Sequence, residues 1–348
     1  MRKRGLFLTG LLYRFFKNMI TKTTVIQSNT VNPYYNLALE EYLVETVEEG
    51  ECILYLWQND KTVVIGKNQN AWAQCNLSLL EQAGGFLARR SSGGGAVYHD
   101  MGNLNFTFVA HNEDYNVSKQ LDVIARAVKE FGIDARKTGR NDITVSDKKI
   151  SGNAFHKGSR ASCHHGTLLI NSDMDALSKY LNVSEKKLRS KGVDSVRSRV
   201  VNLSSLGDVS TDSMKEALII SFSEVYGVSS RDIDVSRLNY ERIEEIRLKY
   251  ASDEWRLGRN PKFSFNFDNR FDWGEIQVCL DVENEKVKKC KVYSDALDVE
   301  FVNSLEGVLV NTAFSKAELT NAILSLNSDQ KTVNMVKDVA EFLGQQNI

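Results

Sequence analysis

Apolar residues recur along the chain with two different periods, and each period predicts a different kind of element. Helical spacing predicts four main helices, over 33–47, 121–131, 214–226 and 234–257, the last of them long and charged. Pro33 marks the entry of the first helix and Asn36 is its possible N-cap, whereas Gly132 and Gly227 end the second and third. A shorter helix is expected after Ser172, with Asp175 completing its cap.

Short apolar runs bounded by turn residues predict the strands. These runs are 52–57, 62–65, 104–110, 143–145, 149–155 and 166–171. Asn59 and Asp60 separate the first two runs, which are therefore predicted to form a β-hairpin, and Asp147-Lys148 supplies a turn between the fourth and fifth. Alternation of apolar and polar residues over 104–110 predicts a half-buried strand.

Breaks in these patterns divide the chain into an extension, two domains and a linker. Gly258-Arg259-Asn260-Pro261 stops a helix, so 258–261 is the expected linker between a catalytic domain (19–257) and an accessory domain (262–348). The accessory domain is strand-like first and helical from about Val299. Residues 1–18 have a basic start and an apolar stretch, but Arg14 interrupts it and no A-x-A-like site follows. We expect a dispensable extension here rather than a signal peptide or a membrane-surface helix.

Composition sets limits on the partners. With 348 residues, 42% hydrophobic and 26% charged, the chain has the make-up of an ordinary soluble protein. Its net charge of -1 argues against nucleic acid as a partner, and no apolar stretch predicts insertion in a membrane. The five cysteines are scattered without a C-x-x-C motif, which indicates reduced thiols and a cytoplasmic protein.

One glycine-rich stretch concentrates the candidate chemistry. Arg89 and Arg90 precede two serines and the glycines Gly93 to Gly95, and ordered sequence resumes at Ala96-Val97-Tyr98. Glycine lets successive backbone N–H groups converge on an anion, and arginine presents a planar charged fork to phosphate oxygens. A mobile glycine loop is the alternative, but a loop between strands is more often a binding loop.

Lys149 is the strongest candidate outside this loop. It precedes the small polar residues Ser151, Gly152 and Asn153, against which a ligand could pack, although a solubilising lysine at a strand edge is the plainer interpretation. Lys148 fits the spacing equally well. Strand alternation places Lys149 on the face of Ser151 and Asn153, which favours Lys149.

Three other features have both a functional and a structural interpretation. Asp142 could bind Mg²⁺ beside phosphates or could be a turn residue. Adjacent residues of Cys163-His164-His165 point to opposite faces of a strand, so hydrogen bonds to neighbouring strands are favoured over a shared metal. The basic residues of 185–202 could form a solvated face or could bind an anionic ligand or an acidic partner. The chain lacks P-loop, G-x-S-x-G and H-E-x-x-H motifs, so phosphate binding with a nearby lysine points to acyl-adenylate chemistry.

Several of these motifs together resemble the bacterial lipoate–protein ligases. They are, in chain order, NPYYNLALEEYL, VVIGKNQNAW, RRSSGGGAVYHDMGNLNFTF, GRNDITV, KKISGNAF, HHGTLLIN and KGVDSVRSRVVNL. The resemblance covers nearly everything from Met19 onward. It implies an α+β fold: a mixed-sheet catalytic domain flanked by helices, like that of biotin ligases and class II synthetase cores, plus a small α/β accessory domain.

The resemblance also implies the reaction and its residues. Lipoate and Mg-ATP would give lipoyl-adenylate and pyrophosphate, and the lipoyl group would then pass to a lysine on a lipoyl domain of a 2-oxoacid dehydrogenase complex or on the glycine-cleavage H protein. Lys149 would be catalytic, bridging the lipoyl carbonyl and the adenylate phosphate. The other residues implied are Arg90, Gly95, Ala96, Val97 and Tyr98 for the nucleotide, Gly94 and His165 for lipoate, and Asn103 and Asp142 near the pocket.

Two alternatives to a ligase remain. One is an ATP-independent lipoyl or octanoyl transferase on the same scaffold, for which Cys163 is the candidate nucleophile. The other is a non-catalytic protein that binds lipoate or a nucleotide. The arginine-rich glycine loop and the accessory domain favour the ligase, while the preferred acceptor and the choice between lipoate and octanoate stay open.

Overall fold

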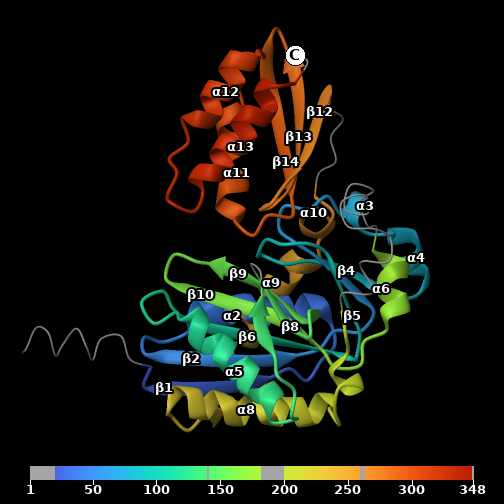
Figure 1. Ribbon diagram of the computed structural model, residues 1–348, viewed down its shortest axis with the longest axis vertical. Helices are drawn as coiled ribbons and strands as arrows, with labels where there is room; N and C mark the ends of the chain where they lie inside the picture. Colours follow the sequence, from blue (N-terminus) through green and yellow to red (C-terminus); the bar gives the residue numbers. More distant parts are fainter. Residues whose placement is uncertain (1–19, 139–140, 182–199, 259–262, 347–348) are drawn as a thin grey trace, which may run out of the picture.

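A mixed sheet of eight strands forms the centre of the molecule. The computed structural model describes residues 20–138, 141–181, 200–258 and 263–346 (Figure 1). In the sheet the strand order is β11-β1-β2-β6-β10-β9-β8-β7. The strands are β1 (Lys22–Gln27), β2 (Glu51–Trp57), β6 (Asn103–His111), β7 (Arg136–Thr138), β8 (Asp142–Val145), β9 (Lys148–Lys157), β10 (Ala161–Leu169) and β11 (Arg231–Asp232). Strands β11 and β2 run parallel to β1 and the remaining pairs are antiparallel, which confirms the expected mixed sheet.

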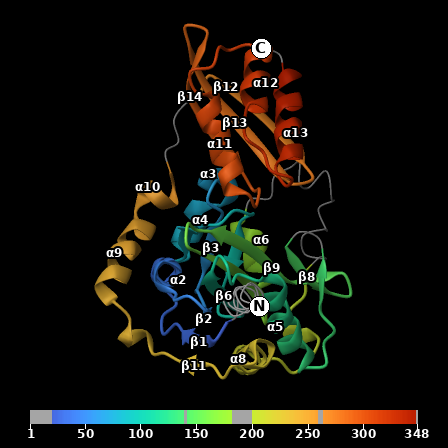
Figure 2. The same ribbon diagram turned by 90° about the vertical axis from the view of Figure 1, so that its left-hand side faces the viewer.

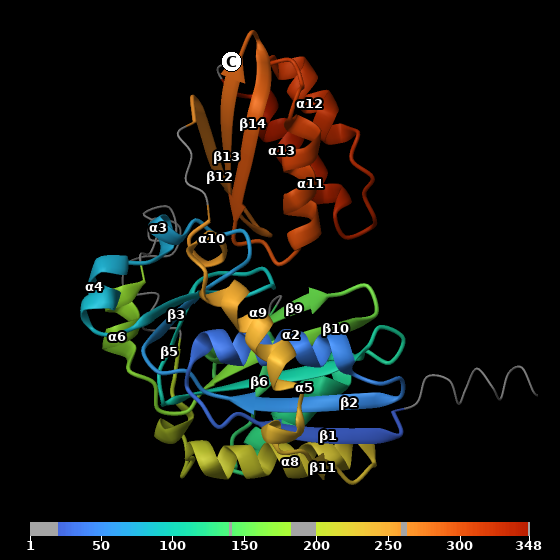
Figure 3. The ribbon, with the colours of Figure 1, turned by 180° about the vertical axis from the view of Figure 1, so that it is seen from behind.

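Helices cover both faces of this sheet. Helices α5 (Val117–Lys129) and α8 (Thr211–Tyr226) pack on one face, and α2 (Pro33–Thr46) and α9 (Tyr240–Ala251) pack on the other (Figures 1 and 3). Alternate residues of β2 divide between the two cores: Leu54 contributes to the first, and Tyr55 to the second. Strand β6 is buried along both faces, so the prediction of a half-buried strand is wrong. Alternation assigned one face of this strand to solvent, but helices cover both faces of the sheet.

The predicted β-hairpin is also wrong. Strand β3 (Thr62–Ile65) does not pair with β2. It pairs with β4 (Phe86–Arg89) and β5 (Val97–His99) in a separate three-stranded sheet. Asn59, expected in a surface turn, is fully buried, and its side chain bonds to Asn36 and His99. The connection between β2 and β3 is therefore part of the core rather than a tight turn.

Capping side chains set the helix ends differently from the predictions. The side chain of Asn32, not of Asn36, accepts hydrogen bonds from the first N–H groups of α2. In the same way Asp173, rather than Ser172, caps α6 (Met174–Tyr180). The segment 234–257 is not one long helix: a 3₁₀ turn (Val235–Arg237), α9 and α10 (Asp253–Arg256) follow one another, because short polar side chains restart the helix at each cap. The remaining short elements are α3 (Ala71–Gln74), α4 (Leu77–Gln82) and a 3₁₀ turn (Leu203–Ser205).

The C-terminal residues form a second body with its own core. Strands β12 (Phe265–Phe271), β13 (Gly274–Glu283) and β14 (Lys286–Ser294) make an antiparallel sheet, and α11 (Val299–Leu309), α12 (Lys316–Leu324) and α13 (Val333–Gly344) pack against it (Figure 2). This confirms the expected order of strands followed by helices.

Several expectations concern residues outside the described ranges. They are the extension 1–18, most of the linker 258–261, and most of the basic run 185–202. All five cysteines are free thiols, as expected. Among the described helices, none combines the length and the apolar character needed to cross a bilayer.

Candidate active site

The glycine loop and Lys149 line one cavity, which was the main expectation from the sequence. The cavity has a volume of about 610 Å³ and lies between the large sheet, helix α2 and the β4-β3-β5 sheet. Its lining contains eight of the predicted residues: Arg90, Gly94, Gly95, Ala96, Val97, Asp142, Lys149 and His165. Residues far apart in the sequence therefore meet where the motifs predicted.

A second cavity adjoins the first. It has a volume of about 360 Å³, and its lining includes Tyr98 and Asn103. The two cavities share six lining residues: Ala96, Val97, Lys149, Gly152, Thr167 and Asp295. The two residues expected at lipoate, Gly94 and His165, line only the first cavity, and so do two of the residues expected at the nucleotide, Arg90 and Gly95. Lys149 thus stands at the border between the two cavities.

The floor of the first cavity is a row of residues that crosses five strands. Asp142 pairs with Gly152, Thr167 pairs with Asn105, and Asn105 pairs with Trp57. The Gly152 N–H donates to Thr167 Oγ1 at 3.2 Å, which joins the two parts of the row. All five residues line the cavity. Because neighbouring strands lie about 4.8 Å apart, the row from β8 to β2 spans roughly 19 Å and gives the cavity an elongated floor.

A β-bulge decides where the amine of Lys149 points. The register between β8 and β9 shifts so that Ile150 has no partner, and alternation fails between Lys149 and Ser151. The predicted common face of Lys149, Ser151 and Asn153 is therefore wrong. The Lys149 amine instead lies over Gly152, where a Cβ would approach it to 2.9 Å. The bulge and the glycine together aim this lysine into the cavity.

Asp142 is the immediate neighbour of this amine. Its Oδ1 atom lies 2.8 Å from Lys149 Nζ, and the two side chains are 38% and 34% exposed. A partly exposed carboxylate at the rim of a phosphate-sized space has the oxygen chemistry that Mg²⁺ prefers, so Asp142 fits a role in holding Mg²⁺.

The two arginines of the loop bind backbone carbonyls. Arg90 is buried and donates to the carbonyl oxygens of Val64, Gly93 and Gly95 at 3.2, 2.7 and 2.8 Å. Burial lowers the pKa of Arg90 to about 10. Arg89 lies outside both cavity linings and donates to six carbonyls, those of Gly66, Lys67, Gln69, Trp255, Arg256 and Leu257. The guanidinium groups thus fix the shape of the loop, a role that the sequence did not predict.

The glycines also allow the C-terminal body to contact the loop. The Gly94 N–H donates to the Ala296 carbonyl at 3.1 Å, and a Cβ on Gly93 would lie 2.3 Å from that same oxygen. Gly94 itself has a φ of +93°, which side-chain-bearing residues rarely adopt. At least one N–H group that was expected to face an anion is therefore occupied by the second body.

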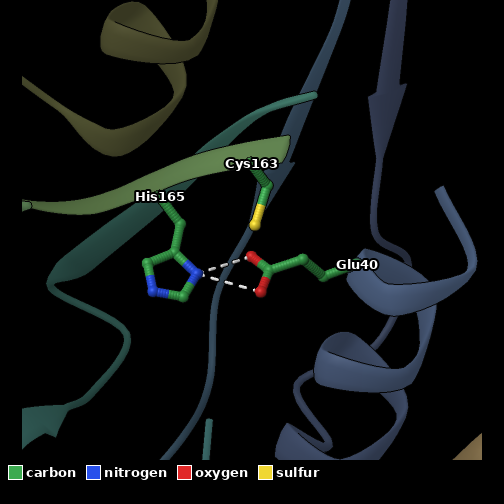
Figure 4. Close-up of side chains that lie close together, drawn as sticks. All are labelled: Glu40, Cys163 and His165. Atoms are coloured by element: carbon green, nitrogen blue, oxygen red, sulfur yellow. Dashed lines mark hydrogen bonds and ion pairs between the residues drawn. The ribbon is translucent and has the colours of Figure 1, made fainter. Parts of the chain in front are cut away.

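A buried carboxylate that the sequence did not single out lies behind the cavity wall. Glu40 accepts a hydrogen bond from His165 Nδ1 at 2.8 Å (Figure 4). The other ring nitrogen, His165 Nε2, lies 2.7 Å from Ser92 Oγ. Arg90 Nε donates to the same Ser92 oxygen at 3.0 Å. A continuous chain of hydrogen bonds thus joins helix α2 to the glycine loop through His165.

A second chain of donors ends on Glu40. Trp57 Nε1 donates to Thr107 Oγ1 at 3.1 Å, and Thr107 donates to Glu40 Oε2 at 2.7 Å. Burial acts to raise the pKa of Glu40, but the interactions with His165 and Thr107 outweigh it and lower that pKa below its usual value. An ionised Glu40 therefore orients two walls of the cavity, Trp57 and His165. The signal in the sequence was an acidic residue at helical spacing between Leu37 and Leu43.

The same region holds a group with the spacing of a metal site. Donor atoms of Glu40, Cys163 and His165 lie within 4.8 Å of one another (Figure 4). Both carboxylate oxygens already accept hydrogen bonds, and burial raises the pKa of the Cys163 thiol well above its usual value, which disfavours the thiolate that binds metal. We interpret the group as a hydrogen-bond network. His164 points to the opposite face, where it contacts Asn153, as alternation predicted.

Two buried histidines predict how stability depends on pH. Burial lowers the pKa of His99 and of His164 from 6.5 to about 3, so both are neutral in the folded protein. Between about pH 3 and pH 6.5 the unfolded chain binds more protons than the folded protein. The free energy of unfolding should therefore fall as the pH decreases, by about 1.4 kcal/mol per pH unit for each histidine. Urea denaturation between about pH 7 and pH 5 measures this slope. In His164→Gln the slope should be smaller by one such contribution, and an unchanged slope would contradict the assignment.

Comparison with known proteins agrees with this geometry. The family model for the lipoyl protein ligase A/B catalytic domain matches residues 32–223, and the model for the bacterial lipoate protein ligase C-terminus matches residues 260–343. The chain is 39% identical over 336 residues to a lipoate-protein ligase A of Psychrobacter cryohalolentis, which covers 92% of this chain and 98% of the relative. A lipoate-protein ligase A of Bdellovibrio bacteriovorus is 34% identical over 331 residues, or 92% of this chain and 98% of the relative.

Solved structures give the same result. The structure of P. falciparum LipL1 in complex with lipoate has a TM-score of 0.82 and 32% identity, and covers 93% of this chain and 100% of its own. A lipoate-protein ligase A bound with ATP has a TM-score of 0.59 and 30% identity, and covers 69% of this chain and 99% of its own. Two family models match the chain, relatives match it over nearly their whole length, and the fold is shared. The chain therefore belongs to the lipoate–protein ligase family.

Proposed function

We propose that this chain activates lipoate with Mg-ATP and transfers the lipoyl group to a lysine of an acceptor protein. The observation that carries the proposal is the position of Lys149, which lines both cavities. Its amine lies beside Asp142 and Gly152, where the row that ends at Trp57 begins. Relatives support both substrates, because one solved structure contains lipoate and another contains ATP.

The reaction has two steps that share one mixed anhydride. A lipoate carboxylate oxygen attacks the α-phosphorus of ATP, so that an O–P bond forms and the bond to pyrophosphate breaks. The acceptor amine then attacks the acyl carbon, a C–N bond forms and AMP leaves. Negative charge develops on the acyl and phosphate oxygens, and the Lys149 ammonium at the border of the cavities would stabilise it. Bound Mg²⁺ would neutralise phosphate charge, with Asp142 as the residue that fits it.

The remaining predicted residues divide between the two substrates in this proposal. The second cavity would hold the nucleotide against Ala96, Val97, Tyr98 and Asn103. The first would hold the acyl chain along the row of sheet residues, with Gly94, Gly95 and His165 in its wall. Arg90 would act on the nucleotide chiefly by fixing the loop, because its guanidinium already binds the loop's carbonyls.

The acceptors in this proposal are lipoyl domains of 2-oxoacid dehydrogenase complexes and the glycine-cleavage H protein. A related structure from Thermoplasma acidophilum, at 32% identity and a TM-score of 0.61, is described as a bi-partite lipoate protein ligase and its E2 lipoyl domain. A cytoplasmic location is part of the proposal and is supported by the five free thiols.

Exchange of labelled pyrophosphate into ATP separates the candidate functions. Lipoate-dependent exchange is the expected result. Acyl transfer from a lipoylated donor without exchange would favour the transferase, and binding without either activity would favour a non-catalytic protein. Cys163, the candidate nucleophile of a transferase, is buried, lines neither cavity and has a raised pKa, all of which count against that alternative.

Deletion of residues 1–18 is expected to leave the rate of exchange unchanged. The motifs and the two matched family models all lie beyond these residues. The same assay on the truncated chain, with circular dichroism as a check on folding, measures the effect. A large loss of exchange in a folded truncated protein would show that the extension belongs to the enzyme.

A further inference from the structure

Two buried nitrogen atoms at the end of the first cavity farthest from Lys149 have no hydrogen-bond partner among the described residues. They are His99 Nε2 and Asn105 Nδ2. The two side chains are 3% and 1% exposed, and both line the cavity. A buried polar group without a partner is costly, so such a pair beside a cavity indicates a polar ligand atom.

Hydrogen bonds to fixed carbonyls determine which nitrogen of His99 carries a proton. The amide nitrogen of Asn36 donates to the carbonyls of Thr30 and Gln58, which fixes the orientation of that amide. The same nitrogen donates to Asn59 Oδ1 at 2.9 Å, so the amide nitrogen of Asn59 faces His99 Nδ1 at 3.2 Å. Nδ1 therefore accepts a hydrogen bond, and in the neutral ring Nε2 carries the proton.

The amide of Asn105 is bonded on one side only. Its Oδ1 atom lies 3.0 Å from Asn103 Nδ2, and Asn105 Nδ2 and Asn103 Oδ1 both lack a partner, so the same bond forms with both amides turned over. Asn105 therefore brings one unpartnered polar atom to the cavity, and His99 is the donor whose role its neighbours fix. A ligand that satisfies His99 must bring an acceptor atom.

The surroundings of these two side chains are apolar. Leu37, Trp57 and Val64 line the same part of the cavity, and the His99 ring stands edge-on to the Trp57 ring with centroids 6.1 Å apart. Asn105 lies next to Trp57 in the row that starts at Asp142, which is three strands from Asn105 and four from Trp57. A chain held at Lys149 and laid along this row would bring its far end to His99 and Asn105.

We propose that His99 and Asn105 form a polar subsite that selects an acyl ligand whose far end carries hydrogen-bond acceptors, as the disulfide ring of lipoate does, over a plain hydrocarbon chain such as octanoate. The inference rests on the proposed function and deepens it. Sulfur is a weak acceptor, but a methyl end offers none, and octanoate would leave the His99 N–H buried and unsatisfied. A site built to hydrogen-bond its substrate rejects the analogue that lacks the bonding atom.

The test compares lipoate with octanoate in His99→Phe, which keeps a ring and removes the donor. In pyrophosphate exchange, the wild-type protein should have the higher kcat/KM for lipoate, and His99→Phe should lower the lipoate-to-octanoate ratio by about tenfold. His99→Gln, which restores an N–H group, should recover part of the ratio. The matched control His111→Phe, at the end of β6 and outside both cavities, should keep it. Each ratio compares the two acids within one protein. Partial unfolding would lower both rates by the same factor and leave the ratio unchanged.

The outcomes separate this inference from the proposed function. Exchange with both acids and an equal ratio in wild type and His99→Phe would overturn the subsite while the ligase proposal stands. Exchange with neither acid would overturn the ligase proposal. Equilibrium dialysis of lipoate and octanoate without ATP then still tests the subsite, because the ratio of affinities should fall in His99→Phe, and an unchanged ratio would refute it.

Discussion

Lys149→Ala should reduce lipoate-dependent pyrophosphate exchange by at least about 100-fold, the loss seen when one preorganised donor to a developing negative charge is removed. The amine lies over Gly152 on a bulged strand and borders both cavities. Among the described residues, no other lysine lines either cavity. Two arginines line the first cavity, but Arg90 binds backbone carbonyls and Arg270 pairs with Glu275 and Asp295, so neither is placed to replace the amine. The loss is expected mainly in kcat, because the charge that the amine stabilises is largest in the transition state.

Lys148→Ala is the matched control. Lys148 precedes Lys149 on the same strand, is exposed and lines neither cavity. Its removal should change exchange by less than about twofold, since a surface charge of this kind contributes little. Equal losses in the two variants, or full activity in Lys149→Ala, would show that the lysine in the cavity is not the catalytic one.

Glu40→Ala should lower the free energy of unfolding by about 2 to 6 kcal/mol, the range for leaving two buried donors without an acceptor. Both oxygens of Glu40 are used, by His165 and by Thr107, and the side chain is 2% exposed. Its loss leaves the donor chains from Trp57 and from Ser92 without an end point. Urea denaturation at neutral pH measures the change.

Glu45→Ala on the same helix provides the comparison. Glu45 is exposed and pairs with Arg242 at 2.7 Å, so its removal should cost less than about 1 kcal/mol. Glu40→Gln keeps an acceptor but not the charge, and its loss of stability should lie between those of the two alanine variants. Equal stability of Glu40→Ala and Glu45→Ala would refute the central place of Glu40 in the network.

The sequence predicted the elements better than their partners. Periodicity located most of the helices and strands, because it depends only on neighbours along the chain. It could not show that β3 joins a second sheet, since Asn59 looks like a turn residue and is instead buried against Asn36 and His99. Nor could it show that 234–257 breaks into short segments, because that depends on which polar side chains cap a helix end.

The candidate site was predictable in its members and not in its contacts. The motifs placed Lys149 and the glycine loop together, as the cavity lining confirms. A bulge at Ile150 changed the face of Lys149, and bulges have no signature in alternation. The network around Glu40 was missed because its members come from five separate segments, and only folding brings them within hydrogen-bonding distance.

A crystal structure with a non-hydrolysable lipoyl-adenylate analogue tests the central claim most directly. The acyl chain should run along the row from Gly152 towards Trp57, with the nucleotide in the cavity lined by Tyr98 and Asn103. The Lys149 amine should lie within hydrogen-bonding distance of both the acyl and the phosphate oxygens. An analogue bound with its acyl chain outside this row, and with the Lys149 amine still paired only to Asp142, would contradict the account.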